Sequence, residues 1–128
     1  MKKVMVFGTF DILHPGHLNF FNQAKKHGDY LVVVVARDVN VKKIKNRLPK
    51  NNEDERLGRV LASGVADEVI LGHRSDPYDC IVKINPDVIC LGYDQNSFTG
   101  KLREFFPEIK TVRLEPYKPE IYKSSKLR

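Results

Sequence analysis

Two histidines, His14 and His17, stand in the segment GTFDILHPGH at residues 8–17, between a short apolar run and a helical pattern. Pro15 suits the first position of a helix, and Gly16 has no side chain, so a phosphate can approach the backbone closely there. The dipole and the free backbone N–H groups of a helix start attract phosphate. Two imidazoles can also donate hydrogen bonds to phosphoryl oxygens that gain charge during transfer. The segment therefore predicts a phosphate site suited to phosphoryl transfer without a covalent intermediate.

Two simpler interpretations of His14 and His17 compete with this one. A histidine at a helix start is often only a cap or a surface residue, and His-x-x-His spacing also occurs in metal sites. Neither predicts the whole string, in which a strand-like run leads through Gly-Thr-Phe-Asp and His-Pro-Gly-His into an amphipathic helix. We therefore favour the phosphate site and assign no protein ligand to a metal.

The segment is flanked by elements that can position it at the edge of a parallel sheet. Residues 4–7 form a continuous apolar run that ends at Gly8, and residues 30–36 are apolar on both faces, as buried parallel strands are. A helical stripe from about residue 16 to residue 26 lies between them and stops at Gly28. Strand, helix and strand in this order predict a right-handed βαβ unit, with a ligand at the carboxyl ends of the strands.

Alternating helical and strand patterns continue along the chain. Residues 37–52 are polar and basic and predict a loop, interrupted by Pro49. Asn52 and Glu55 resemble a capping box, which opens a helix whose core face is expected to carry Leu57, Val60 and Leu61. Further elements are expected as strands at 69–71, 88–92 and 111–114, a helix starting at Pro77 and a short helix at 101–106. The pattern predicts one α/β domain over residues 1–128, with a Rossmann-like, doubly wound and mainly parallel sheet of about five strands.

The composition of the 128 residues limits the classes of function. A total of 22 Lys and Arg residues against 16 Asp and Glu residues gives a formal charge of +6. This charge favours an anionic partner: a phosphate-bearing small molecule, a nucleic acid or an anionic membrane. A hydrophobic content of 41% excludes a disordered tail. The apolar runs are too short for a signal peptide or a membrane span, and Cys80 and Cys90 are too few for a disulfide framework, so a cytoplasmic protein is expected.

The segment at residues 8–17 resembles the signature of the cytidylyltransferase-like nucleotidyltransferase superfamily, with its H-x-G-H motif. Two further segments, DEVI at 67–70 and PDVICLGYDQ at 86–95, are similar to later motifs of that family. YKSSKLR at 122–128 is similar to its late serine/threonine motif, although the sequence ends where many relatives continue into a helix. The resemblance covers almost the whole chain. It implies a HIGH-type nucleotidyltransferase fold and an enzyme that joins a nucleoside triphosphate to a phosphorylated acceptor and releases pyrophosphate.

Within the superfamily, VARD at 35–38, the basic segment after it and LGYDQ at 91–95 most resemble archaeal-type FAD synthases. This resemblance implies that AMP is transferred from ATP to the phosphate of FMN. The alternative is a resemblance to glycerol-3-phosphate cytidylyltransferases, which implies CTP and glycerol 3-phosphate or a similar phosphorylated acceptor as substrates. Both families imply Mg²⁺ with the triphosphate. A homodimer is expected from the same resemblance.

The resemblance also implies roles for particular residues. His14 and His17 are expected to contact the phosphates and stabilise the transition state. The nucleotide site is expected to comprise Thr9, Phe10, His14, Pro15, Gly16, His17, Asp94, Tyr122, Ser124 and Ser125. The basic run at residues 42–50 is either a solvated loop or supplies Lys43 and Arg47 to the acceptor phosphate. Arg56 is a further phosphate candidate, because an arginine presents a planar fork of donors.

Three other classes of protein fit the sequence less well. A class I aminoacyl-tRNA synthetase shares the His-x-Gly-His idea, but 128 residues are too few to add tRNA recognition. A nucleic-acid-binding module predicts aromatic residues among the basic ones, and residues 42–50 contain none. A catalytically silent nucleotide sensor does not need both imidazoles. We therefore expect no nucleic-acid or membrane partner.

Overall fold

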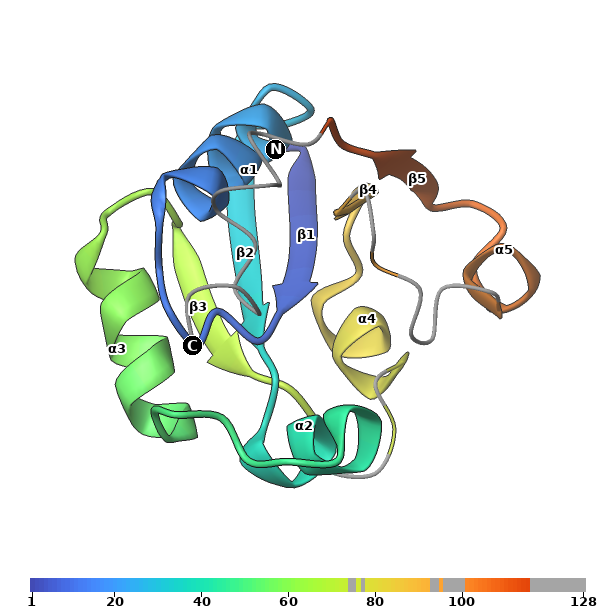
Figure 1. Ribbon diagram of the computed structural model, residues 1–128. Helices are drawn as coiled ribbons and strands as arrows, with labels where there is room; N and C mark the ends of the chain where they lie inside the picture. The colour runs from blue at the N-terminus through green and yellow to red at the C-terminus, as the bar shows by residue number, and fades with distance from the viewer. Residues whose placement is uncertain (74–75, 77, 93–94, 96–100, 116–128) are drawn as a thin grey trace.

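The structure is a computed structural model of the chain, and it describes residues 1–73, 76, 78–92, 95 and 101–115. Five parallel strands form one sheet in the order β3-β2-β1-β4-β5 (Figure 1). Their bounds are β1 Lys3–Gly8, β2 Tyr30–Val35, β3 Glu68–Leu71, β4 Val88–Leu91 and β5 Lys110–Arg113. The predicted α/β class with a parallel five-stranded sheet is confirmed.

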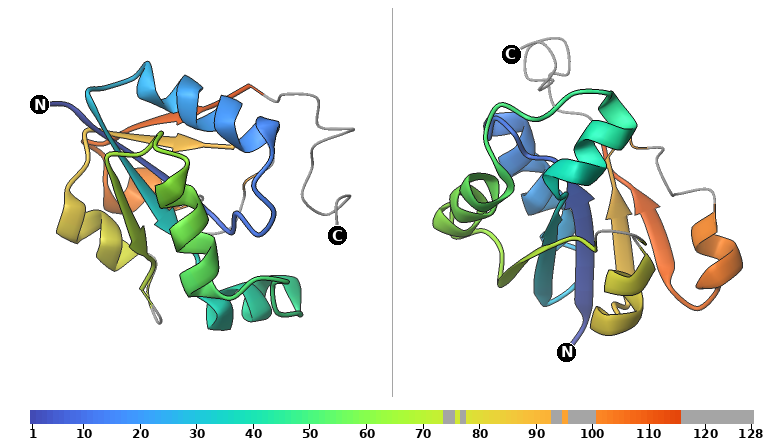
Figure 2. Two further views of the ribbon diagram at one scale, coloured as in Figure 1. Left: turned by 90° about the vertical axis from the view of Figure 1, so that its left-hand side faces the viewer. Right: turned by 90° about the horizontal axis from the view of Figure 1, so that it is seen from below.

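Helices cover both faces of this sheet. Alternate residues of β1 point to opposite faces, so this strand contributes to a buried cluster on each face. Val4 and Val6 belong to one buried cluster, to which α1 (Pro15–Lys25) and α3 (Glu53–Ala62) contribute. Met5 and Phe7 belong to a second cluster, to which α4 (Tyr78–Ile84) and α5 (Leu102–Phe105) contribute. Figure 2, in its right-hand view, shows α1 and α3 on one side of the strands and α4 and α5 on the other. No helix in the described part of the chain is long and apolar enough to cross a membrane.

The segment predicted as a loop at 37–52 contains a helix, α2 (Asp38–Lys45), so that prediction was wrong for its first half. Asp38 lies in the first turn of α2, and three lysines lie in its last turn, where they complement the helix dipole. Val41 is buried and anchors the helix. Asn46 ends it in the left-handed conformation, with a φ of 58°. Residues 46–52, which we call the crossing loop, then lead to α3.

The start of α3 follows the predicted capping box. The Asn52 side chain accepts a hydrogen bond from the Glu55 N–H at 2.9 Å, and the Glu55 carboxylate accepts one from the Asn52 N–H at 3.3 Å. The predicted core face is only partly correct, because Val60 is buried whereas 56% of Leu61 is exposed. Arg56, four residues before Val60, occupies the buried face instead.

The strand order reverses between β1 and β4, because β2 lies next to β1 on one side and β4 lies next to it on the other. Ligands of open parallel sheets bind at the carboxyl ends of strands at such a point. The Gln95 side chain joins the two strand ends here: its amide donates to the Phe7 carbonyl oxygen at 3.1 Å and accepts from the Gly92 N–H at 3.2 Å. The turn that follows β1, residues 9–14, therefore lies where this fold places a ligand.

Candidate active site

The turn after β1 begins with a tight bend at Phe10, whose φ is 51°. Such a left-handed backbone is uncommon for a bulky residue and often marks a functional turn. The Phe10 ring is buried and packs edge-on against His17, with ring centroids 5.3 Å apart. A Cβ atom at Gly8 would lie 2.5 Å from this ring, so the bend requires glycine there. The Phe10 side chain supports His17 from the core, and its predicted place in the nucleotide site stays a prediction.

His14 caps α1 with its own side chain. Its Nδ1 accepts a hydrogen bond from the Gly16 N–H at 3.1 Å, and its carbonyl oxygen accepts one from the His17 N–H at 2.9 Å. Pro15 stands at the first helical position, as predicted. The sequence predicted free N–H groups here, but the Gly16 N–H is already occupied by the imidazole. Because Nδ1 accepts, the neutral His14 ring carries its proton on Nε2, which is then a donor.

His17 stacks on His14, with ring centroids 3.9 Å apart and planes inclined by 18°. Burial, together with the nearby charges of His14 and Lys45, lowers the pKa of His17 to about 3, although a hydrogen bond with the backbone of Ile12 acts in the opposite direction. Burial also lowers the pKa of His14. Both rings are therefore neutral at pH 7, and the neutral His14 ring has its Nε2–H to donate, whereas the N–H of neutral His17 serves the backbone of Ile12.

This depressed pKa predicts that acid weakens the folded state. The unfolded chain takes up a proton at His17 near pH 6.5, whereas the folded chain takes it up only near pH 3. Stability is therefore full above pH 6.5 and falls as the pH decreases from 6.5 towards 3, by at most about 1.4 kcal/mol per pH unit. Urea unfolding at pH 7, 6 and 5 measures this slope. A His17→Asn variant should lose less stability over the same range, and an equal loss would contradict the assignment.

The predicted acceptor residues have different environments. Lys43, on α2, and Arg47, in the crossing loop, are exposed. Lys45 was not among the predicted site residues, yet its charge acts on His17. The last turn of α2 therefore contributes positive charge near the histidine pair.

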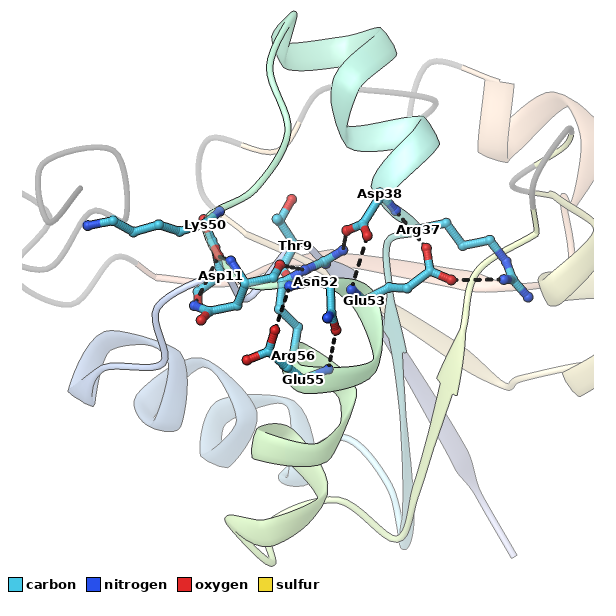
Figure 3. Close-up of polar contacts among 10 residues, drawn as sticks. Thr9, Asp11, Arg37, Asp38, Lys50, Asn52, Glu53, Glu55 and Arg56 are labelled. Atoms are coloured by element: carbon cyan, nitrogen blue, oxygen red, sulfur yellow. Dashed lines mark hydrogen bonds and ion pairs between the residues drawn. The ribbon is translucent and has the colours of Figure 1, made fainter.

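Arg56 is fully buried, so it does not offer its guanidinium to an acceptor phosphate in this structure. Its Nη1 donates to the Thr9 carbonyl oxygen at 2.8 Å, its Nε to the Asn51 carbonyl oxygen at 3.0 Å and its Nη2 to Asp38 Oδ1 at 2.6 Å (Figure 3). The predicted acceptor role of Arg56 does not match this environment. The guanidinium instead holds the turn after β1, the crossing loop and α2 together.

Asp11 is a buried residue of the turn after β1 for which the sequence predicted no role. Its two carboxylate oxygens accept hydrogen bonds from successive backbone N–H groups of the crossing loop, Lys50 at 2.8 Å and Asn51 at 2.9 Å (Figure 3). The Asn51 side chain donates back to the Asp11 carbonyl oxygen at 2.7 Å. Its position in the GTFD string was the available signal.

The structure thus brings together Thr9, Phe10, His14, Pro15, Gly16 and His17, all within one turn and one helix start. Four predicted nucleotide-site residues lie outside the described residues: Asp94, Tyr122, Ser124 and Ser125. Among the residues that are described, no three His, Cys, Asp or Glu side chains are grouped to hold a metal ion.

Comparison with known proteins identifies close relatives along the chain. The sequence pattern of the family described as cytidylyltransferase-like matches residues 5–128. A protein of Ferroglobus placidus named FAD synthase is 54% identical over 105 residues, which are 81% of this chain and 67% of that protein. A protein of Thermoplasma volcanium with the same name is 38% identical over an alignment of 132 positions, gaps included, which covers 100% of this chain and 92% of that protein.

Solved structures are similar too, among them one of high identity. The crystal structure of a Thermoplasma volcanium protein, described as a lipopolysaccharide core biosynthesis protein, matches with a TM-score of 0.85 at 38% identity. The match covers 92% of this chain and 99% of that one. The sequence match and the structural match therefore both extend over nearly the whole of this chain.

Proposed function

The chain belongs to the cytidylyltransferase-like family, and we propose that it is an FMN adenylyltransferase that forms FAD and pyrophosphate from MgATP and FMN. The observation that carries the proposal is the set of curated relatives named FAD synthase, at 54% and 38% identity over most of this chain. The stacked histidine pair at the switch point of the sheet supports it, because a nucleotide phosphate is the ligand that this position favours.

The reaction needs an in-line attack by an FMN phosphate oxygen on the α-phosphorus of ATP. A new phosphorus–oxygen bond forms, the bond between the α-phosphorus and the bridging oxygen breaks, and pyrophosphate leaves with its electron pair. The attacking phosphate is already anionic near pH 7, so no side chain has to remove a proton. The barrier is set by positioning and by crowded negative charge, which N–H donors, cations and the Mg²⁺ of the substrate offset.

The histidine pair suits that task. We propose that His14 and His17 donate hydrogen bonds to the phosphates, with Nε2 the donor of His14 because its Nδ1 caps α1. An approaching triphosphate is strongly negative and raises the pKa values of both rings, so either can gain a proton as the nucleotide binds. We propose Thr9, Pro15, Gly16, Asp94, Tyr122, Ser124 and Ser125 as the remaining nucleotide contacts. Phe10 would contribute its backbone.

The cationic groups of α2 and the crossing loop supply the acceptor side of the proposal. Lys43 and Arg47 are exposed and can reach a phosphate outside the protein surface. Lys45 adds charge close to His17. We propose that this group binds the FMN phosphate. The absence of aromatic residues from 42–50 supports a small anionic acceptor over a nucleic acid.

The test is a panel of substrate pairs. MgATP with FMN should yield FAD and pyrophosphate in equal amounts, measured by chromatography and by a coupled pyrophosphate assay. CTP with glycerol 3-phosphate should yield far less pyrophosphate. A preference for CTP and glycerol 3-phosphate would overturn FMN adenylyltransfer, and no pyrophosphate from any pair would overturn the enzyme.

Three further features are proposed with this function. A homodimer is expected from the family resemblance, and sedimentation of the purified chain tests it. The Mg²⁺ is expected to arrive with ATP and to keep several of its waters, so chelation should stop the reaction. A cytoplasmic location fits two buried, unpaired cysteines, Cys80 and Cys90.

A further inference from the structure

We propose that Asp11 is a positioning residue for the transfer, because its carboxylate holds the crossing loop against the turn that carries the histidine pair. The proposal rests on the proposed function for the reaction that it serves. The bonds themselves, from the Lys50 and Asn51 N–H groups to Asp11, are features of the fold. We call the set of hydrogen bonds made by Asp11 and Asn51 the clasp.

The clasp needs a carboxylate at this position. Two successive backbone N–H groups point at Asp11, and only a carboxylate offers one acceptor oxygen to each of them without a donor of its own. Hydrogen bonds to an ionised acceptor are also shorter and stronger than neutral ones. Because only 1% of Asp11 is exposed, water cannot easily replace these partners.

Arg56 adds a second connection between the same two segments. It donates to Thr9 in the turn and to Asn51 in the crossing loop. Its third bond, to Asp38, extends the network to the start of α2, where Asp38 and Glu53 each accept the other's backbone N–H. Residues 38–51, which we call the basic segment, are therefore held at both ends. Glu53 at the start of α3 holds Asp38, and Asp11 holds Lys50 and Asn51.

The clasp joins the two parts of the chain that carry the proposed nucleotide and acceptor groups. The turn carries the histidine pair, and the basic segment carries Lys43, Lys45 and Arg47. Lys50 is tied through its backbone while its side chain stays exposed. The clasp thus fixes the distance between the proposed nucleotide and acceptor groups. It does so through backbone N–H groups, so the basic side chains stay available to a phosphate. In-line transfer needs reacting atoms about 3–3.5 Å apart, and a misplacement of about 1 Å can cost about a hundredfold in rate.

The experiment compares Asp11→Asn with the wild type in single-turnover FAD formation at saturating MgATP and FMN. The asparagine keeps the shape but turns one acceptor into an NH₂ group that faces a donor. The rate constant should fall by about a hundredfold, while the separate dissociation constants of FMN and of a non-hydrolysable ATP analogue change little. Amide exchange should rise at Lys50 and Asn51 and stay unchanged in β1.

Glu55→Ala is the matched control. It breaks the capping box at Asn52, where the crossing loop meets α3, and lowers the melting temperature without removing a hydrogen bond of Asp11. Its single-turnover rate should equal that of the wild type. If Asp11→Asn were as fast as the wild type, or if the capping variant slowed the reaction equally, the positioning role would be overturned.

A variant with a milder defect covers the case in which Asp11→Asn does not fold. Asn51→Ala removes only the side-chain half of the clasp and should slow the transfer less, by about tenfold. An unchanged rate in Asn51→Ala would then count against the clasp. A wild-type chain that forms no FAD would overturn the proposed function alone. The clasp would still be judged by exchange at Lys50 and Asn51, and protection that survives in the variants would overturn it.

Discussion

A His17→Ala variant is expected to form FAD about 10²–10³-fold more slowly than the wild type at saturating substrates, because it loses one donor to the charge that develops on the phosphates. His17 is the more enclosed partner of the pair, between the His14 ring and the edge of Phe10. These neighbours hold its ring in place, so little reorganisation is needed as the charge forms. Single-turnover FAD formation at pH 7 measures the loss.

The control for this variant is His27→Ala, since His27 lies just beyond the end of α1 and has no place in the proposed site. Its rate should match the wild type. The near-ultraviolet circular dichroism and the melting temperature of the His17 variant should show a folded chain. A rate within a few-fold of the wild type would remove His17 from the proposed chemistry.

The central strands were predictable because their sequence pattern is local. Residues 4–7 and 30–35 are continuous apolar runs, which a sheet covered on both faces requires. Helix α2 was missed because most of its residues are polar or basic, although Val41 is buried and anchors it. The core face of α3 was misassigned at Leu61 because an apolar stripe was expected, whereas a buried guanidinium takes part of that face.

The histidine motif could be predicted from neighbouring residues, whereas the contacts of Asp11 and Arg56 join residues far apart in the sequence. His14, Pro15, Gly16 and His17 lie within four consecutive residues, so the sequence displayed their joint chemistry directly. The partners of Asp11 are 39 and 40 residues away in the chain, and Arg56 reaches Thr9 across 47 residues. A periodicity or a capping rule does not reach across such separations. A buried arginine therefore looked like a surface phosphate contact until its acceptors were visible.

The burial of Arg56 leads to the second large expected effect, on stability. An Arg56→Met variant should be less stable than the wild type by about 3–5 kcal/mol, the range for removing one partner of a buried ion pair. Replacing a whole buried pair by apolar residues is often neutral, but this change removes only the cation. It leaves Asp38 and the carbonyl oxygens of Thr9 and Asn51 without the donor that each now has. Urea unfolding at pH 7 gives the difference.

Arg59→Met separates this effect from the general loss of an arginine on the same helix. Arg59 is exposed on α3, and its replacement should change stability by no more than about 0.5 kcal/mol. Adding Asp38→Asn to Arg56→Met should recover part of the loss, because the unpaired carboxylate is then neutral, although Asp38 is 28% exposed and water already screens it in part. A small loss in Arg56→Met would mean that the three acceptors find water or other donors. The guanidinium would then not be what joins the turn, the crossing loop and α2.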